Sequence, residues 1–135
     1  MTLLVSCHCG STRIEAAELP RTATECNCSF CSRTGAVWGH YPPGELTFLS
    51  LEDDRMYSAS GGMNRHHFCG KCGMHTWGDS PDWGSAYNAD GSPKDGYTEG
   101  TVAEARSFAV DLRPVGGPET TLWVDRRLVG SLLVA

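Results

Sequence analysis

The sequence predicts a single, mainly β domain, and three observations support this prediction. A chain of 135 residues suits one domain with a modest hydrophobic core. Sixteen glycines and seven prolines imply many turns between short elements. Seven cysteines lie in three clusters of the kind that bind metal ions, and bound metal compensates for a small core. We therefore expect one domain over residues 1–135, held together by metal.

Short runs of alternating apolar and polar residues predict the strands. The clearest run is 12–17, in which Ile14 and Ala16 alternate with charged residues. Further strands are predicted at 37–41, 46–51, 55–59, 107–112 and 122–124. Proline and glycine at 42–44 and glycine at 61–62 mark turns between them. The pattern is that of a fold built from short strands.

Two short helices and one long loop complete the predicted organisation. The helices are expected at 29–34, after the middle cysteine cluster, and at 102–105. Residues 79–100 are rich in Gly, Ser, Pro and Asp, which predicts a long ordered loop. Such a loop is either functional or a surface insertion. If it is functional, Trp83 or Tyr87 could close a pocket.

Charge and hydropathy exclude several classes of protein. The net charge is −5, with no basic run to neutralise phosphates, so we expect no nucleic-acid binding. No apolar segment approaches the roughly 20 residues of a membrane helix. The N-terminal apolar run has no Lys or Arg before it, so it does not resemble a signal peptide. We expect a cytoplasmic protein with reduced cysteines; the pattern carries no signal for an oligomeric state.

The first and third cysteine clusters predict one closed zinc site. Cys7 and Cys9 flank one residue, whereas Cys69 and Cys72 form a Cys-x-x-Cys pair, and glycines follow both pairs. Two such pairs supply the four sulfurs of a tetrahedral structural site. A metal bound there would join the start of the chain to its middle. We therefore assign these four cysteines a structural role.

The middle cluster has three cysteines, Cys26, Cys28 and Cys31, which can surround a second zinc within six residues. A catalytic zinc site keeps one position open, and a closed Cys₃His site does not. The candidates for a fourth protein ligand are His40, His66, His67, His75 and Glu25; water or substrate could also take this position. Three thiolates make the metal a weak Lewis acid, which favours thiol exchange over hydrolysis.

Histidines and cations near the clusters are candidates for substrate contacts. Along a strand, alternation would send His66 and His67 to opposite faces, so at most one of them reaches a given site. We predict His75 to lie near the second metal or its substrate. The cations that could pair with substrate carboxylates are Arg33, Arg65 and Lys71.

The cysteine series resembles that of a known family. The matching segments are Cys7-x-Cys9-Gly10, Cys26-x-Cys28-Ser29-x-Cys31 and Phe68-Cys69-x-x-Cys72-Gly73, with support from Arg33, Gly35-Ala36, Tyr57 and Arg65. Over roughly residues 5–78 the chain resembles the glutathione-dependent formaldehyde-activating enzyme family, which also includes centromere protein V. Three clusters in this order make the resemblance far more specific than a lone Cys-x-x-Cys.

The resemblance implies a fold, two metal sites and an activity. The implied fold consists of several coiled antiparallel sheets, related to methionine sulfoxide reductase B. It places one zinc at Cys7, Cys9, Cys69 and Cys72, and a second, catalytic zinc at Cys26, Cys28 and Cys31. The implied activity is that of a carbon–sulfur lyase, which interconverts S-hydroxymethylglutathione with glutathione and formaldehyde. Glutathione would then be a co-substrate.

Three functional hypotheses follow. The first is a zinc-dependent carbon–sulfur lyase acting on a thiol–aldehyde adduct, in which His75 or Glu25 moves the hydroxyl proton. The second is a non-enzymatic, zinc-stabilised binding module that docks a protein through the 79–100 loop. The third is a thiol redox or metal sensor, in which oxidation of the middle cluster releases zinc. The fourth ligand of the middle cluster distinguishes an enzyme from a binding module.

Overall fold

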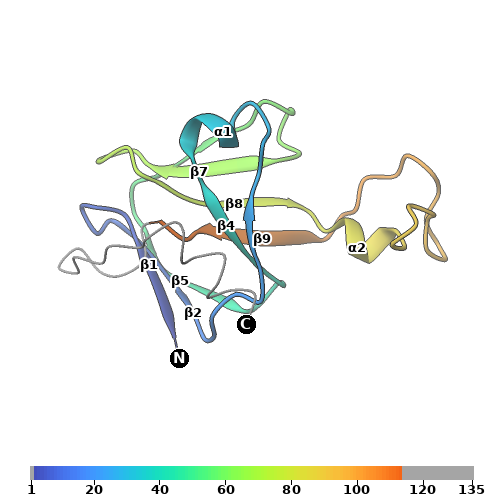
Figure 1. Ribbon diagram of the computed structural model, residues 1–135, viewed down its shortest axis with the longest axis horizontal. Helices are drawn as coiled ribbons and strands as arrows, with labels where there is room; N and C mark the ends of the chain where they lie inside the picture. Colours follow the sequence, from blue (N-terminus) through green and yellow to red (C-terminus); the bar gives the residue numbers. More distant parts are fainter. Residues whose placement is uncertain (1, 114–135) are drawn as a thin grey trace.

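The computed structural model describes residues 2–113, and these form a mainly β structure (Figure 1). The strands are β1 (Leu3–Ser6), β2 (Thr12–Ala16), β3 (Ala23–Glu25), β4 (Val37–Tyr41), β5 (Leu46–Leu51), β6 (Asp54–Tyr57), β7 (Arg65–Cys69), β8 (His75–Pro81) and β9 (Arg106–Asp111). Two one-turn helices accompany them, α1 (Cys31–Thr34) and α2 (Trp83–Ala86). Among the described residues, no helix is long and apolar enough to cross a membrane.

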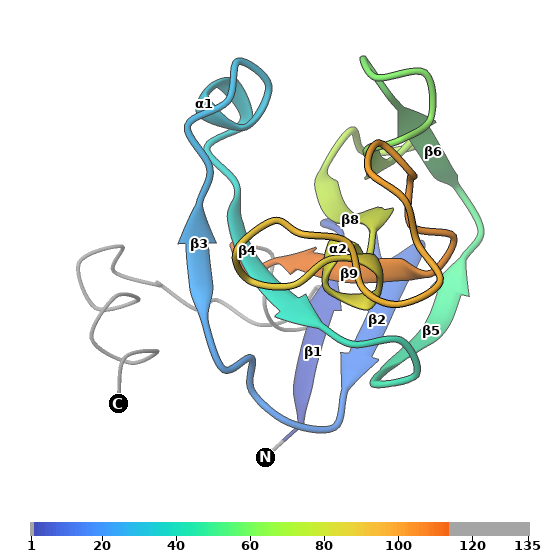
Figure 2. The same cartoon turned by 90° about the vertical axis from the view of Figure 1, so that its right-hand side faces the viewer.

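The strands form two antiparallel sheets. One sheet has three strands in the order β1-β2-β5, and the other has six in the order β3-β4-β9-β8-β7-β6. Figure 2 shows α1 on one side and the turn after β6 on the other, at the same end of the molecule. The segment that contains α2 extends away from the sheets (Figure 1). The mainly β prediction is therefore confirmed.

Alternation along the strands builds the core. In β2 every second residue is buried, as the 12–17 pattern predicts, so Ile14 and Ala16 face inward. The main core cluster consists of Leu3, Val5, Ile14, Ala16, Val37, Tyr41, Trp77, Val110 and Leu112. Phe48 packs against the ring of Trp77 at 4.8 Å between centroids. Fully burying an aliphatic side chain contributes about 1.5–3 kcal/mol, so this cluster supplies much of the folding free energy.

The opposite side of β4 carries a second, smaller cluster. Val37 and Tyr41 belong to the main core. Trp38 points to the other face of β4, where it packs with Cys31 and Ala36. Phe30 covers the edge of this cluster. The six-stranded sheet thus presents one face to the main core and the other to the middle cysteine cluster.

The predicted strands at 37–41 and 46–51 match β4 and β5, and the 107–112 prediction overlaps β9 with a one-residue offset. The 55–59 strand ends earlier, at Tyr57, because the hydroxyl of Ser58 accepts the Gly62 amide and starts a turn. The predicted strand at 122–124 lies outside the described residues. The predicted helix at 29–34 contains α1.

The predicted helix at 102–105 is wrong. These residues form no helix, and the carbonyl of Ala105 accepts a hydrogen bond from the Asp82 amide at 2.8 Å. A single helical turn forms only where other contacts support it, and here pairing with a neighbouring segment prevails. Residues 79–100 also contain more regular structure than predicted. They include the last three residues of β8 and the helix α2.

Candidate metal centres

Four cysteines from distant segments meet at one point. Cys7 follows β1, Cys9 lies in the next turn, Cys69 ends β7 and Cys72 lies in the turn before β8. Their sulfurs all lie within 4.8 Å of one another, and Cys9 is 3.6 Å from both Cys7 and Cys69. Four sulfurs around a tetrahedral zinc at about 2.3 Å would lie about 3.8 Å apart. The group therefore fits a closed metal site.

Glycines shape both turns of this site. Gly10 (φ 83°) and Gly73 (φ 77°) have left-handed backbones that favour glycine. Their amides donate to the carbonyls of Cys7 and Cys69, at 3.1 and 2.7 Å. The amide of Thr12 donates to the Cys7 sulfur at 3.2 Å. Cys7 directly follows β1 of the three-stranded sheet, whereas Cys69 ends β7 of the six-stranded sheet. A metal bound here therefore connects the two sheets.

The surroundings of these thiols set their protonation. Burial raises the pKa of Cys69 to about 12. Hydrogen bonds with the hydroxyl and backbone of Ser11 lower the pKa of the exposed Cys9 to about 6. At neutral pH Cys9 therefore favours the thiolate, whereas Cys69 keeps its proton until a metal binds.

The middle cluster brings three sulfurs together. Cys26 follows β3, Cys28 lies in the connecting loop and Cys31 is the first residue of α1. Their sulfurs also lie within 4.8 Å of one another. The amide of Cys31 donates to the Cys28 sulfur at 3.3 Å and lowers the pKa of Cys28. Burial raises the pKa of Cys31 to about 12.

Within residues 2–113, no histidine, aspartate, glutamate or fourth cysteine joins this group. The first cluster group has four ligand atoms and the middle group has three, as the cysteine spacing predicts. A metal at the middle cluster would therefore keep a position that the described side chains do not fill. All seven cysteines are free thiols, which agrees with metal binding rather than disulfide formation.

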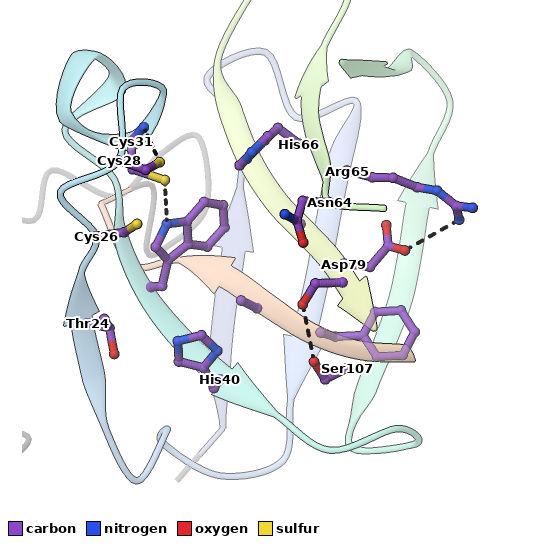
Figure 3. Close-up of a pocket in the computed structure, with 15 residues that line it drawn as sticks. Thr24, Cys26, Cys28, Cys31, His40, Asn64, Arg65, His66, Asp79 and Ser107 are labelled. Atoms are coloured by element: carbon purple, nitrogen blue, oxygen red, sulfur yellow. Dashed lines mark hydrogen bonds and ion pairs between the residues drawn. The ribbon is translucent and has the colours of Figure 1, made fainter. Parts of the chain in front are cut away.

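The three cysteines open onto a pocket of about 370 Å³. Figure 3 shows them on one side of the pocket, with His66 and Asn64 across from them and His40 on β4. Small residues of β8 and β9 form the floor, among them Gly78 and Ala109. A Cβ at Gly78 would lie 3.3 Å from the Trp38 ring, so glycine allows this close approach of the indole. The pocket has room for a small molecule beside the cysteines.

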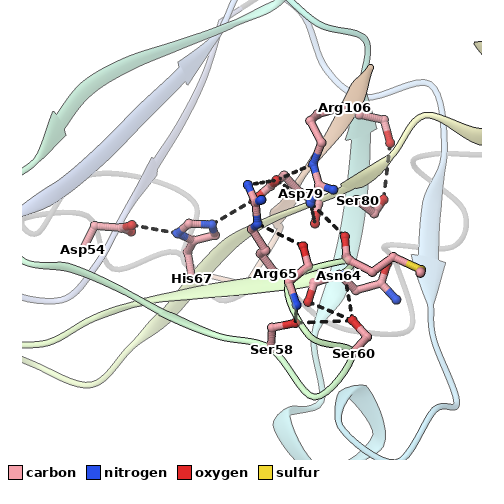
Figure 4. Close-up of polar contacts among 12 residues, drawn as sticks. Asp54, Ser58, Ser60, Asn64, Arg65, His67, Asp79, Ser80 and Arg106 are labelled. Carbon is pink, nitrogen blue, oxygen red and sulfur yellow. Dashed lines mark hydrogen bonds and ion pairs between the residues drawn. The ribbon is translucent and has the colours of Figure 1, made fainter. Parts of the chain in front are cut away.

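The histidines take different places. His66 and His40 line the pocket. His67 lies on the other face of β7, where its ring nitrogens meet Asp54 at 2.7 Å and Asp79 at 2.9 Å (Figure 4). The prediction that His66 and His67 face opposite sides is therefore confirmed. His75, predicted as catalytic, lies outside the pocket lining, and its Nδ1 is 3.2 Å from Asp111. Its catalytic role stays a prediction.

Aromatic rings pack behind the middle cluster. Phe30, between Cys28 and Cys31 in sequence, stacks on His66 with centroids 3.9 Å apart. Tyr57 stacks near the same Phe30 ring at 5.6 Å. The rings of His75 and Trp38 meet edge to face, with centroids 5.0 Å apart. The sequence does not reveal this arrangement, because it depends on the pairing of β4, β7 and β8.

Other predicted contacts do not form. Trp83 and Tyr87 line a separate hollow with Lys94, so neither closes the cysteine pocket. The segment that contains α2 projects from the sheets (Figure 1). Glu25 is exposed at the end of β3 and does not line the pocket.

The three predicted cations also differ in position. Arg33 donates to the carbonyl of Ser29 at 2.6 Å, and Lys71 is exposed in the turn between Cys69 and Cys72. Arg65 lines the pocket, but its guanidinium pairs with Asp79, which also binds His67 and Arg106 (Figure 4). Its charge is thus directed toward this network.

Comparison with known proteins identifies a matching family and a similar fold. A family model described as glutathione-dependent formaldehyde-activating enzyme matches residues 2–99. A solved structure, the crystal structure of a Rhodobacter sphaeroides protein, has a TM-score of 0.61 to this chain at 24% identity. The match covers 96% of this chain and 95% of that chain and shows a shared fold. No curated protein matches the chain.

Proposed function

Because the chain belongs to the glutathione-dependent formaldehyde-activating enzyme family, we propose that it is a carbon–sulfur lyase acting on a thiol–aldehyde adduct. The proposed reaction interconverts S-hydroxymethylglutathione with glutathione and formaldehyde. In the cleavage direction the hydroxyl loses its proton, the carbon–sulfur bond breaks, and the electron pair of that bond remains on sulfur. The released thiolate then takes up a proton.

One observation carries this proposal: the three sulfurs of the middle cluster open onto a pocket, and no fourth described side chain joins them. We propose zinc as the metal at both cysteine groups, because sulfur ligands at these spacings suit it. Zinc at the middle group would supply a positive charge that stabilises the thiolate sulfur of the substrate.

The chain's own residues prepare the site. Trp38 donates its indole N–H to the Cys31 sulfur and holds that ligand in place. Gly78 and Ala109 leave room for the adduct on the floor of the pocket. Phe30 stacks on the pocket-lining His66 with ring centroids 3.9 Å apart and so holds that ring in place.

The test is the rate of exchange between glutathione, formaldehyde and their adduct, followed by NMR with ¹³C-formaldehyde. The wild-type protein should accelerate the exchange, and Cys28→Ser should abolish the acceleration and remove one metal per chain. Ser32→Ala, on the exposed side of α1, is the matched control. If Cys28→Ser retained both the metal and the acceleration, the proposal would be wrong.

A binding module is the second candidate, because exposed apolar side chains occur in α2 and in the chain that follows it. Trp83 is 42% exposed, Tyr97 37% and Val102 45%. If this surface docks a protein and both metals are structural, the protein should neither bind glutathione nor accelerate the exchange. The sensor hypothesis and the cytoplasmic location stay predictions.

A further inference from the structure

The pairing of four strands places two histidines in one row across the sheet. His40 of β4 is opposite Ala109 of β9, Ala109 is opposite Gly78 of β8, and Gly78 is opposite His66 of β7. Residues directly opposite one another share a face of the sheet. Because all four line the pocket, this row defines its floor and two of its walls. His66 therefore reaches the pocket from its own strand.

The two ring nitrogens of His66 differ in their surroundings. Nδ1 is buried and has no hydrogen-bond partner within residues 2–113. Nε2 is not buried and forms no hydrogen bond within residues 2–113, so it is open to the pocket. Stacking on Phe30 at 3.9 Å fixes the plane of the ring. The ring thus presents one nitrogen to a ligand and turns the other inward.

His75 has the complementary arrangement behind His66. Its Nδ1 is 3.2 Å from Oδ2 of Asp111, whose side chain is fully buried. A carboxylate only accepts hydrogen bonds, so Nδ1 of His75 carries the hydrogen and Nε2 carries the lone pair. That Nε2 is also buried without a partner among the described residues. Although burial alone would raise it, hydrogen bonds from His75 and Arg113 hold the pKa of Asp111 below its usual value.

The two unpartnered nitrogens belong to neighbouring rings. The ring centroids of His66 and His75 are 6.0 Å apart, with an interplanar angle of 40°. Buried polar atoms in native structures nearly always have partners, so two orphans on adjacent rings call for a common explanation. One bridging water that accepts from Nδ1 of His66 and donates to Nε2 of His75 satisfies both.

We propose that Asp111, His75 and His66 form a hydrogen-bonded series in which His66 is the catalytic base at the pocket and His75 is a positioning residue. Asp111 fixes the tautomer of His75, His75 fixes that of His66, and the lone pair of His66 Nε2 then faces the substrate. Burial lowers the pKa of His66, which favours the neutral ring that this role needs. The proposal rests on the function proposed above.

The step balances without any further reactant. The adduct's hydroxyl gives its proton to Nε2 of His66, the oxygen electrons form the carbonyl of formaldehyde, and the carbon–sulfur electrons leave with sulfur. In the reverse direction the same nitrogen returns the proton to the oxygen as the bond forms. His66 therefore serves both directions of the reaction.

The test is a double-mutant cycle measured on the purified, metal-loaded protein with glutathione and formaldehyde. His66→Gln should lower kcat at least about 100-fold, the low end for loss of a general base, and leave glutathione affinity and metal content unchanged. His75→Phe keeps an aromatic ring against Trp38 but breaks the series, and should lower kcat about tenfold with KM unchanged. His75→Gln, which can still donate to Asp111 and accept from His66, should recover part of the loss.

The double variant distinguishes positioning from simple packing. If His75 acts through His66, adding His75→Phe to His66→Gln should cause no further loss of kcat. If His75→Phe lowered kcat by the same factor with and without His66→Gln, the proposed series would be wrong. Full activity of His66→Gln in an otherwise active protein would overturn the catalytic role alone and leave the lyase intact. A wild-type protein that binds no glutathione and accelerates no exchange would overturn both proposals. Arg21→Gln, at an exposed residue outside both cysteine groups and the pocket, is the control.

Discussion

The indole Nε1 of Trp38 donates a hydrogen bond to the sulfur of Cys31, at 3.3 Å. Trp38 is buried in β4, and Cys31 begins α1, so this bond attaches the middle metal-binding segment to the six-stranded sheet. Hydrogen bonds to a ligand sulfur orient it and tune the metal. The contact therefore joins the fold to the proposed chemistry.

Replacing Trp38 should weaken the middle metal site. Trp38→Phe retains an aromatic ring in the small cluster but removes the N–H donor. We expect the metal affinity of the middle site to fall about tenfold, the lower limit for losing a hydrogen bond to a metal ligand. Competition with a chromogenic chelator measures this. Trp83→Phe, at an exposed indole on α2, should have no effect. An equal loss in both variants would contradict the role of the hydrogen bond.

The two cysteine groups should respond differently to mutation. Cys69 is fully buried and joins the two sheets, so Cys69→Ser should lower stability by several kcal/mol and Tm by about 10 °C or more. Cys28 is exposed, and Cys28→Ser should keep most of the thermal stability while losing activity. Calorimetry on the metal-loaded variants checks this. Equal loss of Tm in both variants would contradict the division into structural and functional sites.

Metal affinity should depend on pH at both sites. Burial raises the pKa of Cys31 and of Cys69 to about 12, so in metal-free protein each holds its proton at neutral pH. Each metal that binds must release at least one proton. Affinity should therefore fall about tenfold or more for each unit by which pH falls. Chelator competition between pH 8 and pH 6 measures the slope. A flat profile would show that these thiols are already ionised without metal.

A buried charge network on the other face of the sheet should stabilise the fold. The carboxylate of Asp79 binds His67 at 2.9 Å and Arg106 at 2.7 Å, and its side chain is 6% exposed. Asp79→Ala would leave these two partners, and Arg65 as a third, without their shared acceptor and should cost about 3–5 kcal/mol in the free energy of unfolding. Urea denaturation measures this cost. Asp90→Ala, at an exposed loop residue, should cost little; a similar cost there would contradict the prediction.

The cysteine clusters and several of the strands could be predicted because their signals are local. Ligand spacing groups Cys26, Cys28 and Cys31 within six residues, and the patterns at 37–41 and 46–51 mark β4 and β5. The pocket could not be predicted. Which histidine reaches it depends on the register of β7 against β8, and that register is set by contacts far apart in sequence.

Short elements with weak local preference were the other failures. Residues 102–105 look helical by composition, yet Ala105 pairs with Asp82 instead. The helix α2 contains Gly84, a poor helix former, and was therefore not expected. The hydroxyl of Ser85 donates to the Asp82 carbonyl at 2.7 Å and supports this single turn. In both cases a tertiary or capping contact decides the structure.

The central claim is that the middle cluster binds the sulfur of a thiol at an open metal position. Zinc K-edge X-ray absorption tests it most directly, because it counts sulfur ligands per metal. Four protein sulfurs at one site and three at the other average 3.5 per zinc. We predict a rise from 3.5 to 4 when glutathione is added. A sulfur count that glutathione leaves unchanged would contradict the account.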